Sequence, residues 1–70
     1  MTYSQQKNGE RMRKLRMSTG KSTTEVANAL HISESTLRAY ENGARNPSDQ
    51  IKIDIAKYYK VTVENLFFGR

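Results

Sequence analysis

The sequence contains no cysteine, one histidine and one proline among its 70 residues. Without cysteine the chain has neither a disulfide framework nor a thiolate metal site, and His31 cannot form a zinc site by itself. A membrane span needs roughly 20 apolar residues and a secretory signal an apolar run of roughly 7 to 15, whereas the start of this chain is mostly polar. We therefore expect a soluble cytoplasmic protein that folds by packing alone or with a partner subunit.

The motifs of catalysis are also missing. The sequence has no glycine-rich phosphate loop, no paired carboxylates and no base spaced to activate a serine. Its length allows one domain with one small core and leaves no room for a two-lobed enzyme. We expect a single non-enzymatic domain over residues 1–70 with no cofactor, metal or small-molecule ligand, in which residues 1–6 form a flexible N-terminal arm.

Positive charge is concentrated at the start of the chain. The whole sequence carries a net charge of +5. Residues 1–21 contain six basic residues and one acidic residue, Glu10, so this segment alone accounts for that charge. Residues 22–47 are slightly acidic, with two basic and three acidic residues. A basic segment of this kind indicates a polyanionic partner such as DNA, although a basic helix face can also serve solubility alone.

The first half of the chain is divided by signals for the start and end of helices. Good helix formers precede Gly20, a residue favoured just after a helix C-terminus, which predicts a first helix over about residues 6–18. The run Ser22-Thr23-Thr24-Glu25 has the form of a capping box and predicts a second helix over 23–30.

Three further serines and threonines precede helical patterns in the second half. Ser33 is placed to cap a helix over 34–42, Ser48 a helix over 49–59, and Thr62 a short final helix. No segment alternates polar and apolar residues with a period of two, so no sheet is expected. The predicted fold class is all-α, a compact five-helix bundle.

The helices predicted over 23–30 and 34–42 are joined by a tight turn, which is the pattern of a helix-turn-helix. Around them stand Glu41-Asn42-Gly43, Arg45-Asn46-Pro47-Ser48, Ile55-Ala56-Lys57, Val61-Thr62 and Leu66-Phe67. Together with residues 22–33 and 35–37, these motifs resemble the helix-turn-helix family of phage Cro proteins and repressors over residues 9–68. The resemblance implies the lambda-repressor-like DNA-binding domain fold.

The resemblance also implies which residues meet DNA. In this family the third helix enters the major groove, while the second helix and the loop after the third meet phosphates. The residues at the groove positions are Ser33, Glu34, Ser35, Arg38 and Ala39, and those at the phosphate positions are Thr23, Asn42 and Arg45. Arg38 is the best candidate reader because its guanidinium can donate two hydrogen bonds to guanine. Glu34 could accept from a cytosine amino group or serve only the helix dipole.

This sequence departs from the family pattern at two positions. Thr23 stands where many members have glutamine, and His31 stands where the turn usually has glycine, so His31 must adopt a left-handed conformation. A further pair follows the family pattern, because Arg16 and Glu41 match an internal ion pair that joins the first and third helices.

Two functions from different classes follow. The first is a sequence-specific DNA-binding transcriptional regulator of Cro or repressor type, which would dimerise on a two-fold operator. The alternative is a protein-binding modulator or antirepressor that docks on a partner repressor, favoured by the acidic, serine-rich start of the third helix. The residues predicted to form the interface with a second subunit or a partner repressor are Ile53, Leu66, Phe67 and Phe68, because part of this apolar surface should stay exposed in a monomer.

Overall fold

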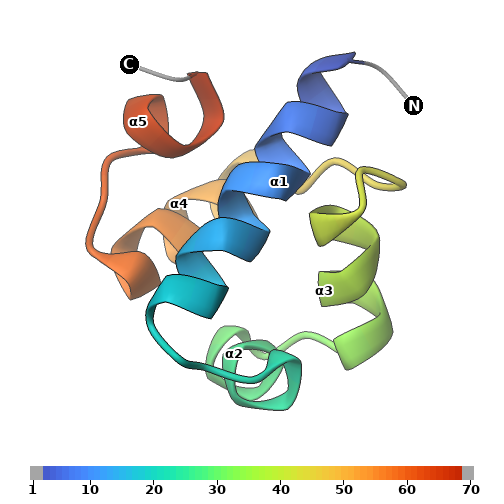
Figure 1. Cartoon of the computed structure of the whole chain (residues 1–70), viewed down its shortest axis with the longest axis vertical. Helices are drawn as coiled ribbons and strands as arrows, with labels where there is room; N and C mark the ends of the chain where they lie inside the picture. The colour runs from blue at the N-terminus through green and yellow to red at the C-terminus, as the bar shows by residue number, and fades with distance from the viewer. Residues whose placement is uncertain (1–2, 69–70) are drawn as a thin grey trace.

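The structure is a computed structural model that describes the backbone of residues 3–68 and the side chains of residues 6–67. Five helices follow one another: α1 (Tyr3–Ser18), α2 (Thr23–Leu30), α3 (Glu34–Glu41), α4 (Asp49–Tyr59) and α5 (Val63–Phe68). In Figure 1, α1 crosses the middle of the molecule, with α2 and α3 below and to one side of it, α4 behind it and α5 on the opposite side from α3. The predicted all-α five-helix class is confirmed. Within the described backbone, no helix is long and apolar enough to cross a membrane.

Serine side chains fix the starts of the three central helices. Ser22, Ser33 and Ser48 each have extended backbone, and each hydroxyl accepts a hydrogen bond from a backbone N–H in the first helical turn. At Ser22 the capping box is complete, because the Glu25 carboxylate also accepts from the Ser22 N–H at 3.4 Å. Each cap satisfies a donor that a helix N-terminus leaves without an intrahelical partner.

The first helix is longer than the sequence predicts. It begins at Tyr3, three residues before the predicted start, so residues 3–6 are helical and do not belong to a flexible arm. Gln5 and Gln6 are good helix formers and nothing before Gly9 interrupts the helix, so the first turn extends toward the N-terminus. Residues 1 and 2 of the predicted arm lie outside the described residues.

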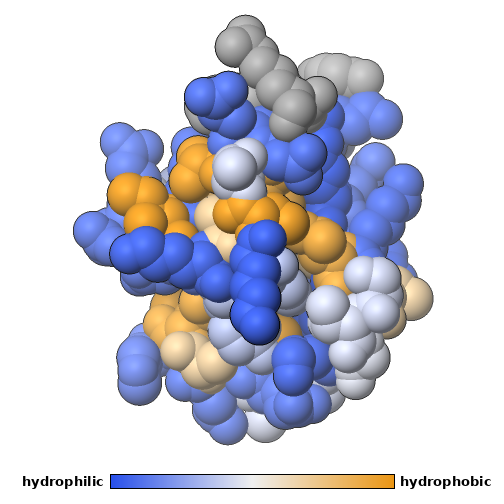
Figure 2. Space-filling view, turned by 90° about the vertical axis from the view of Figure 1, so that its left-hand side faces the viewer, coloured by the Kyte–Doolittle hydropathy of each residue, from blue (hydrophilic) through white to orange (hydrophobic). Residues whose placement is uncertain are grey.

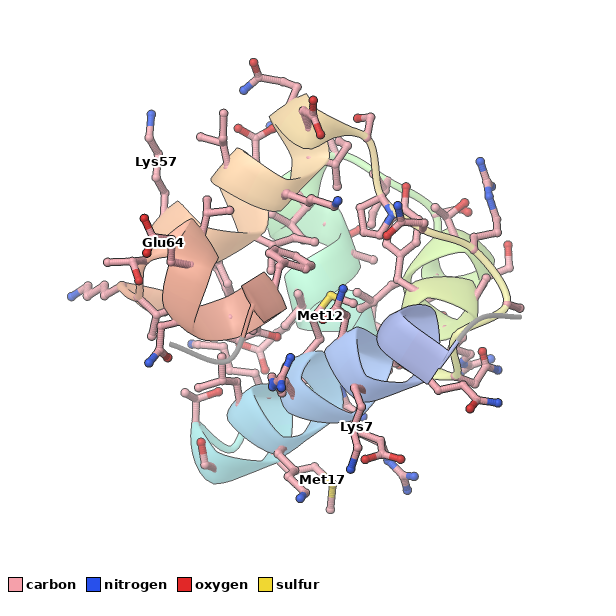
Figure 3. The ribbon with its side chains drawn as sticks, turned by 90° about the horizontal axis from the view of Figure 1, so that it is seen from above. Lys7, Met12, Met17, Lys57 and Glu64 are labelled. Carbon is pink, nitrogen blue, oxygen red and sulfur yellow. The ribbon has the colours of Figure 1, made fainter. Side chains whose placement is uncertain are left out.

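The core lies between the helices and contains one or more residues from each of them. Met12 reaches the centre, whereas Met17 on the same helix points away from the other helices (Figure 3) and is 61% exposed. The buried apolar residues are Met12, Val26, Ala27, Leu30, Leu37, Tyr40, Ile55, Ala56, Leu66 and Phe67.

The burial of the last helix corrects the interface prediction. Leu66 and Phe67 are only 1% and 4% exposed, because α5 folds back and packs on both α1 and α4. These two residues therefore belong to the core and are not available to a partner. Ile53 is 38% exposed, as its position off the inner face of α4 suggests. The side chain of Phe68 lies outside those described.

A glycine sets the distance between α1 and α3. A Cβ atom on Gly9 would lie 2.4 Å from the carbonyl oxygen of Glu41 and 2.6 Å from that of Tyr40. These distances are shorter than a nonbonded contact allows, so only glycine fits unless the helices move apart. Gly9 thus lets the N-terminal half of α1 pack directly on the C-terminal end of α3.

Candidate nucleic-acid interface

The helix-turn-helix consists of α2, α3 and the short turn between them. His31 ends α2 in the predicted left-handed conformation, with φ 58°, and the Ile32 N–H donates to the carbonyl of Ala27 at 3.0 Å. This arrangement satisfies the carbonyls of Ala27 and Asn28 at the end of α2 and leads the chain into α3 within three residues. The buried side chains of Leu30 and Leu37 then hold the two helices together.

One face of α3 is buried and the opposite face is open. Leu37, Tyr40 and Glu41 point inward, as their spacing around the helix requires. The exposed face carries Ser35 and Arg38, and the Arg38 side chain is 63% exposed. An arginine so placed is accessible to a partner that approaches this face of α3.

The other predicted groove residues have local roles. The Ser33 hydroxyl accepts from the Thr36 N–H at 3.1 Å and donates to the Thr36 hydroxyl at 2.8 Å, so it supports the start of α3. The Ser35 hydroxyl lies 3.1 Å from that of Ser33. Ala39 is half-buried and adds only a methyl group to this face.

Glu34 links the starts of the two helices. Its Oε1 accepts hydrogen bonds from the Thr23 and Thr24 hydroxyls, each at 2.8 Å, and from Nη2 of Arg38 at 3.4 Å. These donors lower the pKa of the Glu34 carboxyl below its ordinary value, and the hydrogen bond from the Thr23 hydroxyl makes the largest contribution. Thr23 therefore contacts the start of α3 in the free protein, a role that the sequence did not reveal.

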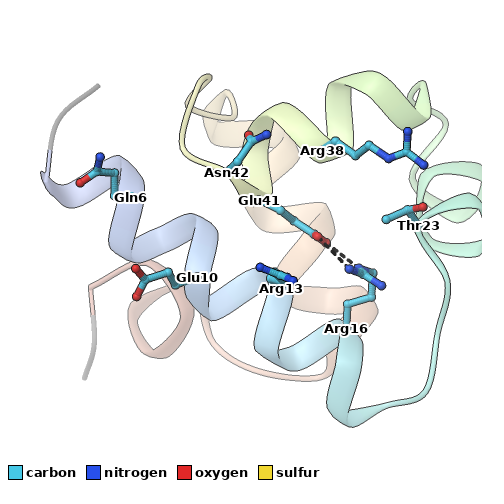
Figure 4. Close-up of a pocket in the computed structure, with 8 residues that line it drawn as sticks. All are labelled: Gln6, Glu10, Arg13, Arg16, Thr23, Arg38, Glu41 and Asn42. Atoms are coloured by element: carbon cyan, nitrogen blue, oxygen red, sulfur yellow. Dashed lines mark hydrogen bonds and ion pairs between the residues drawn. The ribbon is translucent and has the colours of Figure 1, made fainter.

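The predicted ion pair between Arg16 and Glu41 is present (Figure 4). Nε of Arg16 donates to Oε2 of Glu41 at 2.8 Å and Nη2 donates to Oε1 at 3.1 Å, which is the paired geometry that suits guanidinium and carboxylate. A third donor, Nη1, reaches the carbonyl of Lys21 at 3.2 Å. The hydrogen bonds to Glu41 raise the pKa of Arg16. This pair fastens the end of α1 to the end of α3.

A groove of about 620 Å³ is lined by residues of α1, α2 and α3 (Figure 4). Three arginines face it, namely Arg13 and Arg16 from α1 and Arg38 from α3. Its complete lining is Gln6, Glu10, Arg13, Arg16, Thr23, Arg38, Glu41 and Asn42. The sequence pointed to a basic first helix but did not single out Arg13; its place beside α3 follows from the packing of α1.

The basic residues of α1 are divided between two faces. Arg13 and Arg16 line the groove next to α3, whereas Arg11 and Lys14 line a smaller hollow next to Leu66 of α5. Only part of the charge in residues 1–21 therefore lies near the exposed face of α3.

Two predicted phosphate contacts stand at the end of α3. Asn42 is its exposed C-cap, and the backbone N–H of Asn42 donates to the carbonyl of Arg38 at 2.9 Å. The guanidinium of Arg45, in the following loop, lies 5.9 Å from the centre of the Tyr40 ring. This cation–π contact holds an exposed arginine close to the helix-turn-helix.

Comparison with known proteins agrees with this geometry. A family model described as a helix-turn-helix domain matches residues 9–66. The crystal structure of the clp gene regulator ClgR from C. glutamicum superimposes with a TM-score of 0.85 over 97% of this chain and 88% of that chain. The sequences are 19% identical, so this likeness concerns the fold alone. Among curated proteins no significant match is found. Because the family model spans most of the sequence, the chain belongs to the helix-turn-helix domain family, whose members are DNA-binding regulators and not enzymes.

Proposed function

We propose that this chain is a sequence-specific transcriptional regulator of Cro or repressor type, acting in the cytoplasm, that reads an operator with α3. The observation that carries the proposal is the division of α3 into a buried face and an exposed face with Ser35 and Arg38. An α-helix fits the major groove of B-form DNA, and an arginine on its open face can donate two hydrogen bonds to a guanine.

Basic and polar residues beside α3 would meet the phosphates. Arg13 on α1, Asn42 at the end of α3 and Arg45 in the following loop are all exposed. They lie around the recognition helix, which is the arrangement by which backbone contacts position a protein on the duplex. Thr23, held by Glu34 in the free protein, completes the proposed set.

We propose in addition that the chain dimerises, because a single module covers too few base pairs for strong discrimination. Figure 2 shows apolar side chains gathered on the side of the molecule formed by α4 and α5, with hydrophilic residues around them. On these two helices Ile53 is exposed, and Ile51 and Val63 are partly buried. The same surface would serve a partner repressor if the protein acts as an antirepressor, which is the second candidate function.

A binding titration tests the proposal. Anisotropy of a labelled duplex of random sequence, measured between about 50 and 200 mM salt, should show affinity that falls steeply with salt. Selection from a random pool should then yield a preferred site, bound at least about 1000-fold more tightly than random duplex. Absence of duplex binding at low salt, together with capture of a repressor protein, would instead support the antirepressor.

A further inference from the structure

Glu34 places a negative charge on the face that we propose for DNA. Its side chain is 39% exposed, and it belongs to the first turn of α3, one turn before Arg38. Every phosphate of an approaching duplex repels this carboxylate, whatever the base sequence. The charge therefore lowers affinity for all DNA unless a specific contact compensates.

One oxygen of the Glu34 carboxylate already makes its contacts within the protein. Its Oε1 accepts from Thr23, Thr24 and Arg38, so this oxygen is directed at protein donors in the free chain. A direct contact to a cytosine amino group would have to be made by Oε2 or compete with these hydrogen bonds at Oε1.

The contact to Arg38 is weak enough to open. It is a single hydrogen bond of 3.4 Å between side chains that are both well exposed. Exposed pairs of this kind contribute little and are screened by salt. Arg38 can thus leave Glu34 where a guanine stands opposite it in the major groove and accepts two hydrogen bonds, and a groove without that guanine does not offer it this partner.

We propose that Glu34 is a specificity-determining residue that does not read a base. Its charge weakens binding to every duplex, and it holds Arg38 back except where Arg38 gains a base contact. The ratio between operator and random affinity then depends on Glu34 as well as on Arg38. This inference rests on the proposed DNA-binding function, and it assigns to Glu34 a role distinct from both the cytosine contact and the dipole role considered from the sequence.

The test compares Glu34→Gln with the wild type. Glutamine keeps an acceptor oxygen for the two threonines but removes the charge, so the fold should be retained, which circular dichroism checks. The matched control is Glu64→Gln, which removes the same net charge from an exposed residue of α5, on the opposite side of α1 from α3. Anisotropy titrations use a random-sequence duplex and the duplex that the wild type selects from a random pool.

We expect Glu34→Gln to bind random duplex about 5- to 10-fold more tightly at low salt. The logarithm of its affinity should also fall more steeply with the logarithm of salt concentration, by the amount expected for about one additional phosphate contact. Affinity for the selected duplex should rise less, so that the specificity ratio falls. Glu64→Gln should change random affinity by less than about 2-fold.

The remaining outcomes overturn the inference in separable ways. If Glu34→Gln leaves random affinity unchanged and alters the preferred base at one position, Glu34 reads that base. If its binding weakens on all DNA, Glu34 supports the fold of the interface. If wild type binds duplex and Glu64→Gln matches Glu34→Gln, only net charge matters. If neither the wild type nor Glu34→Gln binds duplex at low salt, the proposed function fails as well.

Discussion

Helix α3 carries two glutamates, each paired with an arginine, in two very different surroundings. Glu41, with a side chain 6% exposed, makes two short hydrogen bonds to Arg16 on another helix. Glu34, with a side chain 39% exposed, makes one long hydrogen bond to Arg38 on its own helix. The same two residue types thus form a joint between helices at one end of α3 and a loose surface contact at the other. Burial and geometry, rather than residue type, separate a structural pair from one that can rearrange.

Glu41→Gln removes the buried charge of the first pair, and we expect the largest effect from this substitution. Loss of the charge leaves Arg16 poorly solvated without its partner, at a cost of about 3 kcal/mol in the free energy of unfolding. For a domain of this size the melting temperature should fall by more than about 10 °C. Circular dichroism melts measure this change, and Lys14→Glu on the exposed face of α1 serves as the control. An unchanged melt for Glu41→Gln would remove the claim that the pair joins the helices.

The second change, Arg38→Ala, tests the open end of α3. It should leave the melting temperature within a few degrees of the wild type, since the pair with Glu34 is exposed. Affinity for the selected operator should fall by about 1 to 3 kcal/mol, with poorer discrimination at one base position. Anisotropy with a panel of single-base variants measures both quantities. An equal loss on every duplex would make Arg38 a phosphate contact.

The third change, Thr23→Val, tests the hydrogen bond from Thr23 to Glu34. Hydrogen bonds from Thr23 and Thr24 lower the pKa of Glu34 below its ordinary 4.5. Glu34 therefore contributes stability that is present above pH 4.5 and is lost as the pH falls through the lowered folded-state pKa. Thr23→Val removes the largest cause, so the pKa should move up toward 4.5 and stability should depend less on pH in this acid range. A carbon-detected NMR titration of the Glu34 carboxyl reports the shift, and an unmoved titration would contradict the hydrogen bond.

The smallest effect on stability is expected for Tyr59→Phe, near the buried pair of Arg16 and Glu41. Burial raises the pKa of Tyr59, and the negative charge of Glu41 raises it further. The buried hydroxyl of Tyr59 has no hydrogen-bond partner within the described part of the chain. Tyr59→Phe removes that unsatisfied group, so the free energy of unfolding should stay the same or rise by up to about 1 kcal/mol. Denaturant unfolding measures the difference. A clear loss of stability would mean that the hydroxyl is hydrogen-bonded in solution.

Local signals predicted most of the fold. Ser22, Ser33 and Ser48 cap helices where their sequence positions indicated, and His31 takes the left-handed conformation that the turn demands. What local patterns could not supply was contact between distant segments. The burial of Leu66 and Phe67 depends on α5 folding back onto α1 and α4, which no short window of sequence contains.

The candidate site also has features that the sequence predicted and features that it could not predict. The exposed position of Arg38 follows from helical spacing, and the partnership of Arg16 with Glu41 came from a family resemblance. The bonds from Thr23 and Thr24 to Glu34 join residues ten or eleven positions apart across a turn, so only the three-dimensional structure reveals them. Arg13 could not be singled out either, because nothing in the sequence distinguishes it from the other basic residues of α1.

The absence of a side chain at Gly9 has a mechanical consequence. The backbones of α1 and α3 touch near Glu41, and the Arg16 ion pair fastens the same end of α3 a second time. That helix is therefore held to α1 at its C-terminal end, while its opposite end, about 10 Å away by the helical rise, is held to α2 by Leu37, by the turn and by Glu34. A side chain at residue 9 would therefore push the C-terminal end of α3 away from α1 at the place where the Arg16 ion pair is made, and would disturb both contacts at once.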